Sequence, residues 1–222
     1  LFAVKIWEEI PMSIKKEYYQ KLANTVLKAF EKRFMEGHYC ETIEEAKELA
    51  LSFVSEGSKV SFGGSVTLEE TGVLAELRAR EDITLYDRAT ATTPEENKQI
   101  MHDALSCDYY FMSSNAITVD GELVNIDGNG NRVAALIYGP DNVIILAGMN
   151  KIVKSVEEGI SRTRNVASPQ NCIRLNKDTP CKVNGVCGNC LKDTICDQIV
   201  ITRASRVPNR IKVILVGEEL GF

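Results

Sequence analysis

Apolar residues follow a helical spacing at the start of the chain. Over residues 14–35 an apolar side chain recurs at every fourth position, which predicts an amphipathic helix that Gly37 ends. Farther on, Thr42 and Glu45 have the spacing of a capping box, in which each side chain accepts a hydrogen bond from an unpaired backbone N–H. They predict a second helix that runs to about Val54.

The rest of the chain alternates short apolar runs with helical segments. The run at 142–148 is continuously apolar, as buried parallel strands are. A hairpin is predicted at 116–126, because Asp120-Gly121 is a favoured two-residue connection. The other predicted strands cover 59–62, 82–87, 108–114, 198–204 and 210–217. Further helices are predicted at 67–79 (opened by Thr67 and Glu70), after Thr93-Pro94, at 132–138 and at about 151–166.

This alternation predicts one α/β domain over residues 1–222. Two strands are too apolar to be half-exposed, which indicates a three-layer α/β/α fold with a mostly parallel sheet covered on both faces. N-terminal helices occupy 14–55, and a cysteine-rich segment at about 178–197 is interpreted as an insertion.

Composition narrows the function. The net charge of −5 and the pI near 5.3 disfavour a general nucleic-acid binder, which needs a basic surface. The longest apolar runs, such as 143–147, are far shorter than the about 20 residues that span a bilayer. Lys5, Glu8 and Glu9 interrupt the apolar start, so no signal peptide is expected, and a reducing cytoplasm is the expected compartment.

Glycine-, serine- and asparagine-rich turns follow several predicted strands. Ligands of open α/β sheets bind where strand carboxyl ends meet helix N-termini, because backbone donors and the helix dipole favour anions there. The pattern therefore predicts a pocket for an anion, a small metabolite or a phosphate-bearing ligand, with Arg132 and Lys151 as charge partners. The predicted lining is Gly63, Gly64, Ser65, Ser114, Asn115, Asp127, Gly128, Gly130, Asn131, Arg132, Asn150 and Lys151. Neither a dinucleotide fingerprint nor a P-loop occurs in the sequence.

Two of these stretches carry a family resemblance. "FGGSVTLEETGVL" at 62–74, followed by the stretch "SSNAITVDGELVNIDGNGN" that begins at Ser113, resembles the LUD (lactate-utilisation) domain family over about 14–216. The resemblance implies a fold similar to that of ribose-5-phosphate isomerases, sugar-phosphate deaminases and CoA transferases. Some members are linked to oxidation of L-lactate to pyruvate beside iron–sulfur subunits, so such subunits are implied partners. The resemblance implies no agreed catalytic set.

Among possible catalytic groups, Asp127 is the best candidate for a general base or an acceptor of a ligand hydroxyl. Glu70 is expected to cap its helix and Asp120 to serve the hairpin turn. The two histidines, His38 and His102, neighbour none of the glycine-rich turns.

Two arginines, Arg162 and Arg164, lie near the end of a predicted helix. They are interpreted as a solvated face with favourable helix-dipole placement, the alternative being a docking patch for an acidic partner.

Four of the seven cysteines form a C-x5-C-x2-C-x5-C motif: Cys181, Cys187, Cys190 and Cys196. Four thiolates are the full complement for tetrahedral zinc or for a 4Fe–4S cluster, and Gly185 and Gly188 allow tight turns between them. The motif predicts a metal site, with an iron–sulfur cluster slightly favoured over zinc; disulfides and idle thiols are the alternatives.

Three functions fit these features. The first is a subunit or accessory of organic-acid (lactate-type) oxidation that binds an anion at the turns and a metal at the cysteines. The second is a free-standing enzyme acting on a sugar phosphate or a CoA ester. The third is a ligand sensor without catalysis whose metal is structural. Fold-level likeness alone does not decide among them.

Overall fold

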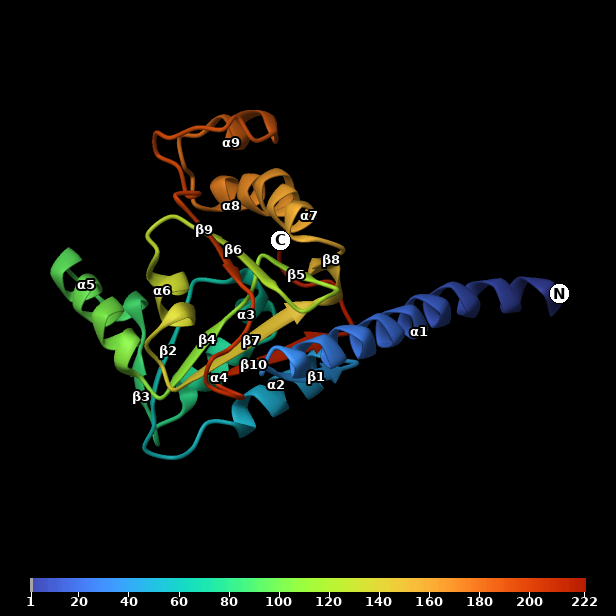
Figure 1. The fold of residues 1–222 in the computed structure, drawn as a ribbon, viewed down its shortest axis with the longest axis horizontal. Coiled ribbons are helices and arrows are strands. Elements are labelled where there is room, and N and C mark those ends of the chain that lie inside the picture. The colour runs from blue at the N-terminus through green and yellow to red at the C-terminus, as the bar shows by residue number, and fades with distance from the viewer. Residues whose placement is uncertain (1) are drawn as a thin grey trace.

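A six-stranded sheet, parallel throughout, forms the centre of the computed structural model, which describes residues 2–222 and side chains from Ile14 onward. Lys5, Glu8 and Glu9, on which the expectation of no signal peptide rests, precede the residues whose side chains are described. The strands run in the order β1-β10-β7-β4-β2-β3 (Figure 1). Their bounds are β1 Glu36–Cys40, β2 Lys59–Phe62, β3 Thr84–Tyr86, β4 Tyr109–Met112, β7 Asn142–Gly148 and β10 Ile211–Val216.

Helices cover both faces of this sheet, which confirms the predicted three-layer α/β/α architecture. Strand β7 shows why: Val143 and Ile145 belong to the core under α1 and α6, whereas Ile144 belongs to the core under α2, α3 and α4. Successive strand residues point to opposite faces, so a continuously apolar strand serves two cores. The helix bounds are α1 Phe2–Lys32, α2 Ile43–Ser52, α3 Val66–Glu70, α4 Val73–Ala79, α5 Pro94–Asp103 and α6 Asn131–Ile137.

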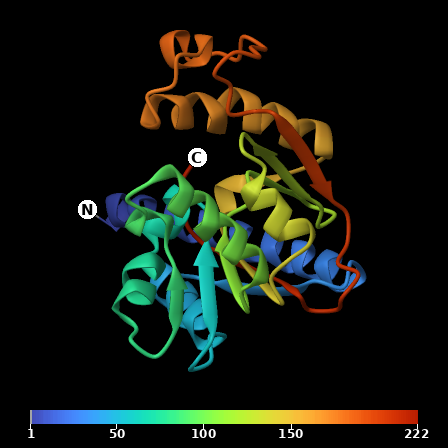
Figure 2. The ribbon, with the colours of Figure 1, turned by 90° about the vertical axis from the view of Figure 1, so that its left-hand side faces the viewer.

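A second, smaller sheet stands beside the first, in the order β8-β5-β6-β9. The predicted hairpin supplies β5 and β6, which pair antiparallel, and β9 adds to β6. Helix α7 packs on this sheet, and α8 and α9 lie beyond it (Figure 2). The bounds are β5 Ala116–Thr118, β6 Leu123–Asp127, β8 Ile152–Val153, β9 Gln198–Thr202, α7 Val156–Arg162, α8 Ser168–Arg174 and α9 Pro180–Asn184.

The predicted end of the first helix was wrong. Helix α1 ends at Lys32, Phe34 takes a φ of 58°, and residues 36–40 form strand β1 at the sheet edge. Gly37 therefore lies in a strand, where a Cβ would come within 2.8 Å of the Phe30 side chain. Strand β1 was not predicted from the sequence, because its side chains are mostly half-buried and of mixed polarity.

Two predicted helices also have different bounds. The segment at 67–79 divides into α3 and α4 because Gly72, with a φ of 72°, breaks it, and Ser65 rather than Thr67 caps α3. The helix predicted at 151–166 begins instead at Val156, capped by Ser155, and continues through a π-helical turn at 163–167 into α8. Short 3-10 turns occur at 88–90, 104–106 and 149–151.

Candidate ligand-binding site

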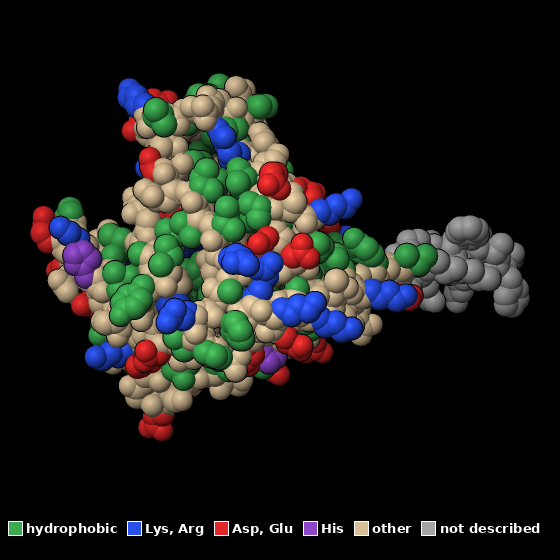
Figure 3. All heavy atoms as spheres, in the orientation of Figure 1, with side chains coloured by type: hydrophobic (Ala, Val, Ile, Leu, Met, Phe, Trp, Pro, Cys, Tyr) green, Lys and Arg blue, Asp and Glu red, His purple; other side chains and the backbone are tan. Residues whose placement is uncertain are grey.

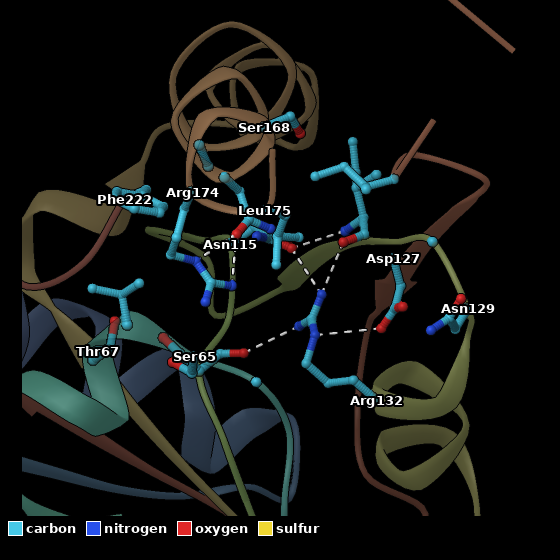
Figure 4. A pocket seen from close by; sticks show the side chains of 18 of the residues that line it. Ser65, Thr67, Asn115, Asp127, Asn129, Arg132, Ser168, Arg174, Leu175 and Phe222 are labelled. Carbon is cyan, nitrogen blue, oxygen red and sulfur yellow. Dashed lines mark hydrogen bonds and ion pairs between the residues drawn. The ribbon is translucent and has the colours of Figure 1, made fainter. Parts of the chain in front are cut away.

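A cavity of about 360 Å³ lies at the carboxyl ends of β2, β4 and β7. It opens between that edge of the main sheet, the start of α6 and the overhanging helix α8 (Figure 4). This is the place where an open α/β sheet presents backbone donors and helix N-termini. Its size is within the usual range for small-molecule sites.

Lys151 is the most deeply buried amine of the cavity wall, with 4% of its surface exposed. It ends the 3-10 turn after β7, and its Nζ donates to Thr67 Oγ1 at 2.7 Å and to Ser113 Oγ at 3.0 Å. Burial lowers the pKa of Lys151 to about 7; the nearby charges of Arg162 and Arg132 add to this shift, and the more weakly acting carboxylate of Glu70 opposes it. Among the described residues, no carboxylate lies within ion-pair distance of this amine.

Arg132, in the first turn of α6, holds together the cavity wall opposite Lys151. Its guanidinium donates to the carbonyl oxygens of Ser113 at 3.1 Å and Ile126 at 2.9 Å, and to Asn115 Oδ1 at 3.1 Å (Figure 4). It also donates to Asn125 Oδ1. The packing is close at Gly63, where a Cβ would lie 3.1 Å from the Arg132 side chain. Arg132 therefore ties the ends of β4 and β6 together.

Asp127 has a double role at the end of β6. One carboxylate oxygen accepts from the Gly130 N–H at 3.0 Å, which holds the turn before α6. The other lies 3.4 Å from Arg132 Nε and, within the described part of the chain, is buried without a hydrogen-bond partner. That second oxygen therefore faces the Arg132 guanidinium with its hydrogen-bonding capacity unused among the described residues.

Three more cations, Arg88, Arg174 and Lys177, line the outer part of the cavity and are exposed. Gly64 makes room for the first of them, since a Cβ there would clash with the Arg88 guanidinium. With Lys151 and Arg132 they make five cationic lining residues, whereas Asp127 is the one acidic side chain among the described lining residues, in a chain whose net charge is −5. The outer face in Figure 3, by contrast, shows acidic and basic side chains interspersed. The cavity is thus a local concentration of positive charge.

Most of the predicted lining residues come together in this cavity: Gly64, Ser65, Ser114, Asn115, Asp127, Gly128, Asn131, Arg132 and Lys151. Three do not line it. Gly63 accommodates Arg132, Gly130 takes a φ of 80° before α6, and Asn150 bonds the backbone of Leu220.

The sequence missed several lining residues: Thr67, Arg88, Ser113, Arg174, Lys177 and Phe222. Thr67 and Ser113 stand inside the glycine- and serine-rich stretches, so counting every hydroxyl side chain of those stretches as lining would have found them. The others reach the cavity only through tertiary packing, and no sequence signal marks them.

Two further interpretations are corrected. Arg162 does not form a solvated face, because it points inward and donates to the carbonyl oxygens of Asn115 at 2.7 Å and Phe222 at 3.2 Å. Glu70 does not cap its helix; its carboxylate accepts from the Gly221 N–H at 2.6 Å.

The cysteine segment lies above α8 and contributes Thr194 and Ile195 to the cavity wall. All seven cysteines are free thiols. Cys181 is buried in α9, whereas Cys187, Cys190 and Cys196 are half-buried in an irregular stretch. Within residues 2–222, as described, no three His, Cys, Asp or Glu side chains converge in an arrangement that holds a metal ion.

Comparisons with known proteins agree with this fold. The model of the LUD domain matches residues 23–216. The structure of a DUF162 family protein from Deinococcus radiodurans is similar, with a TM-score of 0.52 and 13% identity, covering 89% of this chain and 98% of that one. Ribose 5 phosphate isomerase A from Neisseria gonorrhoeae matches with a TM-score of 0.34 and 13% identity, over 51% of this chain and 54% of that one. Among curated proteins, none matches the sequence. Of the helices that the structure describes, none has the length and apolar character of a bilayer crossing.

Proposed function

The chain belongs to the LUD domain family, and from this premise we propose that its cavity binds a phosphate-bearing anion. Lys151 carries the proposal. A buried ammonium normally has a paired charge, because removing it from water is costly. Here its two hydrogen-bond partners in the structure are neutral hydroxyls, Thr67 and Ser113. An anionic ligand group would supply the missing charge.

The size and charge of the cavity favour a phosphate-bearing ligand over a small monocarboxylate. A volume of about 360 Å³ is generous for a three-carbon acid. Besides Lys151, the exposed guanidinium of Arg88 and the cations Arg174 and Lys177 face the same space. Cations spread along a cavity suit a ligand with several negative charges, such as a phosphate ester with a second anionic group.

Membership in the LUD domain family supports a role for this binding in organic-acid metabolism. We propose that the protein serves lactate-type oxidation as a subunit or accessory, beside iron–sulfur partner subunits in a reducing compartment such as the cytoplasm. The cysteine motif supports the redox setting through its iron–sulfur interpretation, since four thiolates suit a 4Fe–4S cluster; zinc, the alternative, carries no redox chemistry.

A second candidate, catalysis on a sugar phosphate or CoA ester, is favoured by one observation. With its pKa lowered to about 7 by burial, Lys151 exchanges a proton readily at neutral pH. The unsatisfied oxygen of Asp127 lies in the same cavity wall. Turnover of such a compound that disappears in Asp127→Asn would favour the enzyme; tight binding without turnover would favour the accessory.

Binding is tested by thermal shift with a panel of anions: lactate, pyruvate, inorganic phosphate, pyrophosphate, ribose 5-phosphate and CoA. A ligand that binds only the folded state raises the melting temperature. Phosphate-bearing members should stabilise the wild type, and Lys151→Met should abolish the shift. Lys154→Met is the matched control, because Lys154 is exposed three residues away and should leave the shift unchanged. A shift that survives in Lys151→Met would refute the proposal.

A further inference from the structure

Strand β9 forms an open edge of the smaller sheet. Within the described residues it pairs only with β6, and it lies on the outer flank of the molecule, as the red strand at the right of Figure 2. Its sequence, QIVIT, carries no charge, yet Ile199 is 51% exposed and Ile201 is 44% exposed. Figure 3 shows apolar side chains gathered on the face where β9 lies. In the described chain, β9 is therefore an apolar strand with one unpaired side.

The other three edge strands of the two sheets are protected from pairing with another chain, as sheet edges usually are. Strand β3 spans three residues and β8 spans two, which is too short for a stable ladder. Strand β1 is longer, but Glu36 and His38 place a charged and an ionisable side chain along it. Strand β9 has five residues and no such protection, so it is suited to accept a further strand.

The backbone groups on the open side of β9 belong to Ile199 and Ile201. In an antiparallel ladder, successive residues direct their N–H and C=O groups alternately to the two sides. The Thr118 N–H donates to the Glu122 carbonyl at 2.9 Å, so the backbone of Glu122 and of every second residue after it faces β5. The intervening residues of β6 face β9, where their partners are every second residue from Gln198 onward. Ile199 and Ile201 consequently direct both backbone groups away from β6.

We propose that β9 pairs antiparallel with β9 of a second copy of this chain, in a dimer with two-fold symmetry. An axis through Val200 sets Ile199 opposite the partner's Ile201, and the reverse. Both isoleucines have outward backbone groups, so each such pair exchanges two hydrogen bonds, and Val200 forms the non-hydrogen-bonded pair on the axis. The two four-stranded sheets would then join into one continuous sheet.

The charges that flank β9 favour a second copy over an unrelated strand. Asp197 and Arg203 lie three positions before and three positions after Val200, so the same axis sets each Asp197 opposite the partner's Arg203. Both side chains are exposed, and neither forms an ion pair within the described chain. Opposite charges that face each other across a strand pair attract. The strand with its flanks is thus complementary to itself.

Pairing would also cover the exposed isoleucines. Residues two apart on a strand point to the same face, and a two-fold axis perpendicular to the sheet keeps that face common to both copies. The side chains of Ile199 and Ile201 from the two copies then form one apolar cluster beside Ile126, the neighbour of Ile199 on β6. Burial of apolar surface and contact between opposed β-branched side chains both stabilise such a pair of strands.

The test is the oligomeric state of the full chain, measured by sedimentation velocity over a range of protein and salt concentrations. We expect a wild-type dimer whose dissociation constant rises with salt. Asp197→Arg and Arg203→Glu should each raise that constant about tenfold or more, because each sets two pairs of like charges across the axis. The double variant Asp197→Arg/Arg203→Glu should restore the dimer. Arg206→Glu is the matched control, since Arg206 is exposed outside the paired stretch and should leave the constant unchanged.

Ile199→Pro tests the backbone pairing itself. It removes an N–H that faces away from β6, so the monomer should tolerate it, whereas the dimer should be lost. A dimer that persists in Ile199→Pro, or a charge swap that does not restore the dimer, would overturn the proposal. A wild type that stays monomeric at its highest soluble concentration would also overturn it and leave this edge to the strand of another protein. Circular dichroism checks folding, and if Ile199→Pro does not fold, the charge variants decide.

Discussion

Lys151 is the residue on which the proposed anion binding depends most. Lys151 itself, after the apolar strand β7, was predicted to line a pocket as a charge partner, and the structure places its amine against Thr67 and Ser113. From the sequence one could predict that a cationic residue follows the carboxyl end of this strand. It could not supply the burial that moves the pKa of this amine, because Thr67, Ser113 and Gly221, which surround the amine, lie far from it in the sequence.

The lowered pKa of Lys151 makes anion binding depend on pH. The protonated amine attracts the anion, and in the free protein it loses its proton near pH 7. Affinity should therefore be highest below pH 7 and fall by up to about tenfold for each pH unit above it. Sulfate is a suitable probe, because its charge is constant between pH 6 and 9. Calorimetric titration of sulfate should show this fall in the wild type; a flat profile would contradict it.

Arg132 acts mainly on stability. Its guanidinium bonds three acceptors on two segments, the turn after β4 and strand β6, and a Lys ammonium cannot reproduce that fork. Arg132→Lys should lower the free energy of unfolding by roughly 2–4 kcal/mol, measured in urea. The exposed Arg206 offers a matched control, since Arg206→Lys should change this free energy by less than about 0.5 kcal/mol. Equal losses in the two variants would rule out the organising role.

At the scale of elements, the sequence predicted helix starts reliably where a capping side chain accepts a hydrogen bond from the first turn of the same helix. Thr42 and Thr93 cap α2 and α5 as predicted, because each hydroxyl accepts from an N–H three residues on. The β1 edge strand was missed, since its pairing with β10 is set by residues far away in the sequence. The second sheet was missed for the same reason: β9 pairs with β6 across a long interval.

Gly72 shows how one residue sets an element boundary. Its φ of 72° lies in the left-handed region, and it separates α3, which borders the cavity, from α4. Gly72→Ala should destabilise the fold by roughly 1 kcal/mol, because a Cβ disfavours that conformation. Asn tolerates the region better, so Gly72→Asn should cost less. Urea unfolding of both variants checks the order; an alanine variant as stable as wild type would contradict the strain.

At the scale of the whole molecule, the contrast between an acidic chain and a cationic cavity is the main finding. Arg88, Arg174 and Lys177 come from separate segments, and only the packing of α8 over the sheet edge brings them to one space. The fold class and the sheet edge were predictable from alternating elements and glycine-rich turns. The charge of the cavity was not, because composition reports only the net value of −5.

The central claim is that this cavity binds a phosphate-bearing anion through Lys151. Calorimetric titration of inorganic pyrophosphate at pH 6.5 tests it most directly, with the wild type, Lys151→Met and Lys154→Met compared at low and high salt. We expect one saturable site in the wild type and in Lys154→Met, weakened by salt and lost in Lys151→Met. Equal binding by all three proteins, or no binding by the wild type, would contradict the claim.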